Sequence, residues 1–390
     1  MRMKKSRGWK YRIRTLSLLM IIGINLFPRD DARLSKTITK TYPANVGSKL
    51  ELNNKYGNVI INTWSYDSIA IAITITSFGK NDEAAAKLME RTDVDFSSTA
   101  SGLVVSTQLD KSDGWLRDFW NELSGYSQTI ISKDQLTVDY DISLPEFVQL
   151  ELYNKFGDVY IAERSATTRI DISNGNLKAE DLTGEVYLNL KFCEADINSI
   201  RQSDITLKSA ELNLGNAHKL TIQSSSSDIY LGSINQIRLV SRTDKISINE
   251  IQTLEGRSSF SKIRLKNVLG GLDLETNYGN LTLDNIDGGF SKVLVHGKST
   301  DINLRFDQLA YFNTRIVAKE GKFELPDDHE LKQVYTDGTE KFIRSTGHLG
   351  VYKSDPGEVN IDAQGGKVRV SFAPFNAHTT KEKNINIEKP

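Results

Sequence analysis

The chain has 390 residues, with 49 Lys or Arg and 50 Asp or Glu, so its formal net charge is -1. This balance argues against a nucleic-acid partner, which normally requires a strongly basic face. A single cysteine, Cys193, excludes an intrachain disulfide framework and a cysteine-based metal cluster. We interpret Cys193 as a small buried hydrophobe, and we expect no cofactor.

Residues 1–30 predict a signal peptide or an N-terminal anchor. Basic residues between positions 2 and 14 precede the apolar run LSLLMIIGINLF, which is too short to span a bilayer comfortably but suits a signal-peptide core. No small-x-small cleavage site follows, so an uncleaved anchor stays open as the alternative. We expect export in a bacterium, to the periplasm, the outer-membrane surface or the medium, with membrane contact only through this segment.

Residues 36–78 alternate apolar and polar side chains, as in SIAIAITITSF, and predict the first coil of a β-solenoid. Residues 79–135 predict a helix-containing excursion from it. Within the excursion, NDEAAAKLMER predicts a helix with an Asn or Asp cap, and VDFSS with GLVVSTQL predicts a hairpin. A Trp-rich loop follows.

Residues 136–326 predict the main β-solenoid. From Val159, a pattern of two apolar residues around one residue that is never aliphatic returns every 17 or 18 residues, and then by two steps of 21 to Ile302 and Phe323. Each repeat carries a second short strand, so stacked coils would pair in parallel about 4.8 Å apart. The sequence therefore predicts an all-β fold, a parallel β-solenoid with 17–18-residue coils and a small α+β excursion near the N-terminus.

A small residue occupies the position two before most strand starts, as Gly157 does in NKFGDVYI. We interpret this position as a tight corner and not as a phosphate-binding loop. Cys193 belongs to the same column. Residues 327–390 lose the 17-residue phase and predict an irregular C-terminal region, with GGKVRVSF as a capping strand.

Two groups of residues are candidates for ligand contact. Aromatic side chains on a loop outside the repeat can bind sugar, membrane or protein, although they can also pack the loop against the solenoid. Three carboxylates in one column would stack about 5 Å apart and could bind a cation weakly, or they could form a solvated corner. No residue spacing predicts a metal site or a catalytic site. The aromatic group is Trp115, Phe119, Trp120 and Tyr126, and the carboxylates are Glu194, Glu211 and Asp228.

The phrases YGNVIINTW, NDEAAAKLMERTDVDF and ISLPEFVQLELYNKFGDVYI, with the Trp-rich loop and serial D-I-x-L coils, resemble an exported bacterial family. This is the "putative adhesin" family of unknown function, and the resemblance covers roughly Lys49 to Phe306. It implies a cell-envelope β-solenoid and supplies no catalytic residues.

We therefore expect a non-enzymatic, exported cell-envelope protein that serves as an adhesin or as a binding or scaffold module. The expected partner is a cell-surface glycan or an envelope protein. The alternative is a polysaccharide lyase or glycoside hydrolase on the same scaffold, because some β-helices place several carboxylates on one exposed face.

Overall fold

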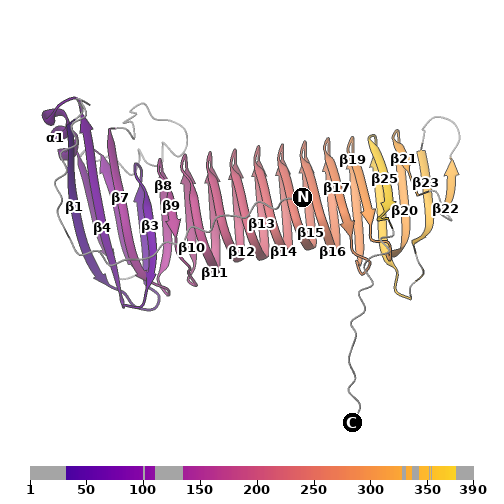
Figure 1. Cartoon of the computed structure of the whole chain (residues 1–390), viewed down its shortest axis with the longest axis horizontal. Coiled ribbons are helices and arrows are strands. Elements are labelled where there is room, and N and C mark those ends of the chain that lie inside the picture. Colours follow the sequence, from indigo (N-terminus) through magenta and orange to yellow (C-terminus); the bar gives the residue numbers. More distant parts are fainter. Residues whose placement is uncertain are drawn as a thin grey trace, which may run out of the picture.

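The computed structural model describes residues 32–99, 102–109, 135–326, 331–335, 342–350, 352 and 354–374 (Figure 1). Within these residues the protein is nearly all β, with twenty-five strands and one helix, which confirms the all-β class. All strands belong to one hydrogen-bonded sheet, and its middle is a long row of parallel strands.

The parallel row keeps its register over most of its length and shifts at a few irregular positions. Leu212 pairs with Ile229 and Ile229 with Ile246, so neighbouring partners are 17 residues apart in the chain. The longest strands cover both short strands predicted for each repeat. The row contains β8 (Gln149–Lys155), β9 (Val159–Ile161), β10 (Thr168–Ser173), β11 (Leu177–Lys191), β12 (Glu194–Lys208), β13 (Glu211–Ser225), β14 (Asp228–Arg242), β15 (Lys245–Ser259), β16 (Lys262–Asn277) and β17 (Asn280–Ile286).

The core is formed by the side chains that alternate inward along these strands. The nine first-position residues of the repeat from Val159 to Ile302 are at most 3 % exposed. The residues between the two inward positions lie outside the core, and Tyr230 among them is 42 % exposed. Burial of one Leu or Ile side chain contributes roughly 1.5–3 kcal/mol, so each repeat adds its own share to one continuous core.

Within the described residues, nine repeats turn through a non-glycine residue with left-handed backbone geometry. The φ angles of these residues lie between 49° and 62°, and the small residue comes immediately afterwards. Gly157 is required for a different reason, because a Cβ there would lie 1.9 Å from the carbonyl oxygen of Gly57 in the neighbouring repeat. A Cβ at Gly175 would likewise lie 2.0 Å from the carbonyl oxygen of Gly157. Gly157 and Gly175 therefore lie at corners where the backbones of neighbouring repeats are too close to leave room for a side chain.

The asparagines of these phrases satisfy the corner backbone. Asn154 Nδ2 donates to the carbonyl oxygen of Gly157 at 2.8 Å, and Asn54 Nδ2 donates to that of Gly57 at 3.3 Å. A buried carbonyl without a donor is costly, so these amides stabilise the turn.

At the N-terminal end of the sheet, the order of the strands in the sheet differs from their order in the chain. β2 pairs in parallel with both β6 and β8, and β3 pairs with both β7 and β9, so residues that come later in the chain lie outside the first repeat. β4 pairs antiparallel with β7, and β1 with β4, which closes this end (Figure 1). The strands are β1 (Ala32–Pro43), β2 (Lys49–Asn54), β3 (Val59–Trp64), β4 (Ser68–Gly79), β5 (Thr92–Thr99), β6 (Gly102–Leu109) and β7 (Leu136–Pro145).

Two local predictions for this end are confirmed. Helix α1 (Asp82–Glu90) begins after Asn81, whose side chain accepts a hydrogen bond from Ala84 N at 2.9 Å. The predicted hairpin is the antiparallel pair β5–β6.

The C-terminal end is also out of sequence order. The expectation that Phe323 follows Ile302 directly in the stack is wrong, because Val368 pairs with both of them. The rung formed by β24 and β25 is thus inserted between two rungs that precede it in the chain, and β22–β23 closes this end with antiparallel pairing (Figure 1). The strands are β18 (Lys292–Lys298), β19 (Asp301–Phe306), β20 (Tyr311–Lys319), β21 (Lys322–Glu324), β22 (Leu331–Tyr335), β23 (Phe342–Gly350), β24 (Gly357–Gln364) and β25 (Lys367–Phe372).

A buried polar ladder replaces aliphatic packing on the inside of the central corners. Asp244 occupies the small-residue column and is 2 % exposed. Its carboxylate accepts hydrogen bonds from the Ser224 hydroxyl, from the Ser241 hydroxyl at 2.7 Å, and from the backbone N–H groups of Ser227 and Arg242 at 2.8 and 3.0 Å. One carboxylate therefore satisfies four donors from two repeats.

We expect Asp244→Ala to lower the free energy of unfolding by about 2–5 kcal/mol, because it leaves these donors buried without an acceptor. Urea unfolding followed by circular dichroism measures the loss. The matched control is Asp244→Ser, the residue found at Ser227 and Ser261 in the adjacent repeats, which should lose less. An alanine variant as stable as the parent protein would contradict the role of this carboxylate.

Candidate binding surface

The left-handed corner residues form a column along one outer edge of the parallel row. From Asn174 to Ser299 they follow one another by one repeat, and the backbone N–H of each donates to the neighbouring rung, as from Thr243 N to Ser259 O at 2.9 Å. We call this the corner column. Its members are Asn174, Phe192, Ser209, Ser226, Thr243, Phe260, Tyr278, Ser299 and Glu320.

Three members of the corner column are aromatic, which the backbone disfavours. Left-handed geometry costs an ordinary residue roughly 1–2 kcal/mol, and Asn tolerates it best. Phe192, Phe260 and Tyr278 nevertheless adopt it, and they are 55 %, 56 % and 49 % exposed. Because strained, exposed aromatic side chains gain little from the core, they indicate a surface that serves contact.

Phe260 and Tyr278 lie in adjacent repeats, and their rings stack parallel to each other, so that each ring covers part of one face of the other. Their ring centroids are 5.1 Å apart and the ring planes differ by 9°. The column residues on either side, Thr243 and Ser299, are small. We call Phe260 and Tyr278 the aromatic ledge.

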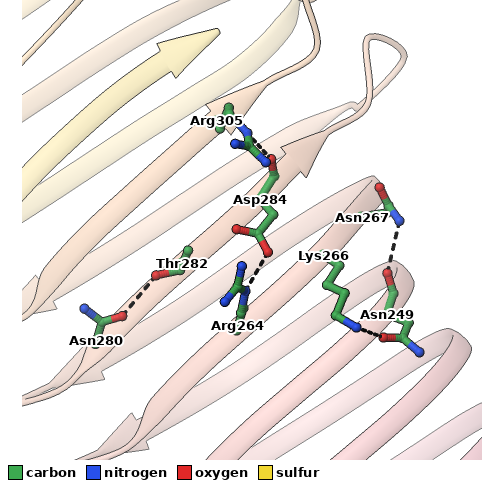
Figure 2. Close-up of polar contacts among 8 residues, drawn as sticks. All are labelled: Asn249, Arg264, Lys266, Asn267, Asn280, Thr282, Asp284 and Arg305. Atoms are coloured by element: carbon green, nitrogen blue, oxygen red, sulfur yellow. Dashed lines mark hydrogen bonds and ion pairs between the residues drawn. The ribbon is translucent and has the colours of Figure 1, made fainter. Parts of the chain in front are cut away.

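The outward face of β15–β19 differs from the ledge, because its side chains bind one another (Figure 2). Arg264 Nε contacts Asp284 Oδ2 at 2.6 Å, and Lys266 Nζ donates to Asn249 Oδ1 at 2.6 Å. Arg305 donates to the backbone carbonyl of Asp284. These bonds tie neighbouring repeats together and leave fewer groups for a ligand.

A hollow of about 470 Å³ lies across β12–β15 on another edge. Its titratable lining groups are Arg201, His218 and Glu250, and Asn235 Nδ2 lies 3.1 Å from His218 Nδ1. This lining offers hydrogen bonds to a polar ligand.

The predicted acidic residues stand in one column, as the repeat requires. Glu194 pairs in register with Glu211, and Glu211 with Asp228. Asp228 contacts Lys245 Nζ at 3.1 Å, and Glu211 accepts a hydrogen bond from Asn213 at 3.3 Å. Among the residues that the structure describes, no group of three or more His, Cys, Asp or Glu is placed to hold a metal ion. Cation binding by this column stays a prediction.

The predicted aromatic loop cannot be compared with the ledge. Trp115, Phe119, Trp120 and Tyr126 lie outside the described residues, as do the predicted export signal and most of the last 20 residues. In the described part of the chain, no helix has the length and apolar character needed to cross a membrane.

Sequence reasoning missed the ledge. The signal was the aromatic residue before the small corner residue, visible in TNYGN and SFSK. Periodicity assigns this position to the turn, but it does not reveal the backbone geometry or the exposure of the ring.

No family model matches the chain, and no curated protein matches it. Solved structures match, and several are described as "putative adhesins", as the sequence resemblance predicts. One from Parabacteroides distasonis has a TM-score of 0.30 and 9 % identity, and one from Parabacteroides merdae has a TM-score of 0.28 and 14 % identity. A "putative lipid binding protein" from Parabacteroides distasonis has a TM-score of 0.24 and 7 % identity. Each alignment covers 87 % of this chain and 97 % of the other.

Cys193 lies in the small-residue column, directly after Phe192 of the corner column, and packs half-buried against the core. Burial raises the pKa of its thiol from 9.0 to about 11. Because the thiolate is the reactive form, we expect alkylation by iodoacetamide at pH 8 to be roughly 100-fold slower than for an ordinary thiol, and the rate to rise with pH up to about 11. The urea-unfolded protein is the control. Equal rates for folded and unfolded protein at pH 8 would contradict the burial.

We expect the double variant Phe260→Asn/Tyr278→Asn to keep the stability of the parent protein within about 1 kcal/mol. Relief of left-handed strain offsets the lost ring stacking, which is worth about 0.5–1.5 kcal/mol. Leu281→Asn, at a fully buried position nearby, is the destabilised control in the same urea titration. A large loss of stability in the double variant would show that the ledge supports the fold.

Proposed function

We propose that the protein is an exported, non-enzymatic β-solenoid that acts as a binding module of the adhesin type. The observation that carries this proposal is the aromatic ledge, two stacked rings held exposed in a backbone conformation that opposes them. Exposed apolar groups of this kind are typical of contact surfaces.

The largely constant register supports the solenoid. Strand pairs such as β12–β13 and β13–β14 advance by one repeat each, and their inward side chains join one core. A chain wound in this way presents the same edge at every turn, so its surface suits an extended partner more than a compact one.

The acidic column supports binding over hydrolysis. A glycoside hydrolase requires two carboxyl groups that flank one glycosidic bond, one as acid and the other as nucleophile or base. Glu194, Glu211 and Asp228 instead follow one another along one edge, and Asp228 is paired with Lys245. Export to the bacterial envelope rests on the basic and apolar N-terminal sequence.

Expression of the full chain with a C-terminal tag in a Gram-negative host tests this function. We expect the protein in the periplasmic or surface fraction, and we expect it to sediment with isolated bacterial envelopes without releasing sugar products from them. A variant lacking residues 16–27 is the control and should stay in the cytoplasm. Cytoplasmic retention of the parent chain, or release of reducing sugar or unsaturated uronate, would overturn the proposal.

A further inference from the structure

The aromatic ledge lies among exposed cations from the repeats on both sides. Arg242 directly precedes Thr243 in the corner column and pairs in register with Ser259, the neighbour of Phe260. Lys298 precedes Ser299 and pairs with Asn277, the neighbour of Tyr278. Lys262 follows Phe260 by two residues on the same turn. The ledge therefore has a positive group before it, beside it and after it.

These three cations have no ion-pair partner within the described part of the chain. Lys245, by contrast, is paired with Asp228 at 3.1 Å. The nearby carboxylates have their own contacts, since Asp301 accepts a hydrogen bond from Lys367 N at 3.0 Å and Glu275 accepts one from Asn277 at 3.4 Å. The charge around the ledge thus favours an anionic ligand.

The two aromatic rings and the distance between repeats indicate which class of anion would bind. A flat aromatic face packs against the apolar C–H face of a sugar ring. Successive repeats are about 4.8 Å apart, close to the length of one sugar in an extended polysaccharide, so Arg242 and Lys298 are roughly 14 Å apart along the row. An acidic polysaccharide could pack its sugar rings against the exposed surfaces of Phe260 and Tyr278 while its carboxylates meet Arg242, Lys262 and Lys298.

Single-stranded nucleic acid also combines flat rings with negative charge. It fits this protein less well, because the net charge of -1 supplies no extended basic surface to follow a phosphate backbone.

We infer that Phe260 and Tyr278, with Arg242, Lys262 and Lys298, form a binding site for an acidic, uronate-containing polysaccharide that lies along the corner column. This inference rests on the proposed binding function and names its ligand class.

Affinity electrophoresis of the full chain in gels containing polygalacturonate, alginate or neutral dextran tests the site. We expect retardation by the two acidic polymers, weakening as salt is raised, and none by dextran. Phe260→Asn/Tyr278→Asn and Arg242→Ser/Lys262→Asn should each weaken binding at least about tenfold, which corresponds to about 1.4 kcal/mol. Both pairs use residues that occur at the same places in other repeats.

The matched control is Lys178→Asn/Lys219→Gln, which removes two exposed positive charges within strands away from the corner column and uses residues found at the equivalent positions of other repeats. It should change the affinity less than about twofold. Circular dichroism and urea unfolding verify that every variant is folded.

Several results would overturn the inference. If the control pair weakened polymer binding equally, the effect would come from net charge alone. If the ledge variant bound the polymers as well as the parent protein does, the ligand would bind elsewhere. Preferential retardation by a thymidine oligonucleotide would assign the site to nucleic acid. Absence of polymer binding in a protein that still sediments with envelopes would reject this ligand and keep the proposed function, whereas loss of both would reject both.

Discussion

The structure depends on one constraint, that each strand pairs in parallel with a strand one repeat further along the chain. Because side chains alternate with a period of two, one inserted residue within a strand would turn its apolar set outward. The chain tolerates unequal repeats only where the pairing can shift, as between Leu182 and Glu185 or opposite Ile251 and Thr253. The phase of the core therefore survives changes of repeat length. Because the phase is kept, equivalent residues of successive repeats lie in columns that run the length of the row.

The columns differ in how freely they can change. A polar residue can replace an apolar one in an inward column only if its hydrogen-bonding groups find partners there. Asp244 meets this condition, because its carboxylate accepts four hydrogen bonds among the buried serines. The corner column is free of both the core and the strand faces, so its members range from Ser226 to Phe260 without disturbing the register. A binding surface built there can vary independently of the fold. That separation explains how strained aromatic side chains persist in an otherwise regular structure.

Much of the fold follows from the sequence, because alternation and period are visible in single letters. The inward position of Ile229, the helix after Asn81 and the corner at Gly157 all depend on local rules. Three features depend on more than local rules. Period alone does not say which repeat lies between two others, so the place of β24 and β25 was missed. Nor does it show that Arg164 is fully buried, with burial lowering its pKa to about 10 and its side chain donating to Val148 O. The exposure of the ledge depends on the φ angle of the residue, which its letter does not report.

Both ends of the row are closed by antiparallel strands, which are β4, β1 and β5 at one end and β23 and β22 at the other. A repeat added at either terminus of the chain would therefore not extend the row, because the terminal rungs already have neighbours on both sides or antiparallel closing strands. Gain or loss of repeats is confined to the uniform interior, where a duplicated unit meets identical pairing above and below. Each such duplication would lengthen the molecule by about 4.8 Å and move the two closed ends apart unchanged. Duplication of internal repeats can thus change the length of the protein by one repeat at a time, while both ends and their contacts stay the same.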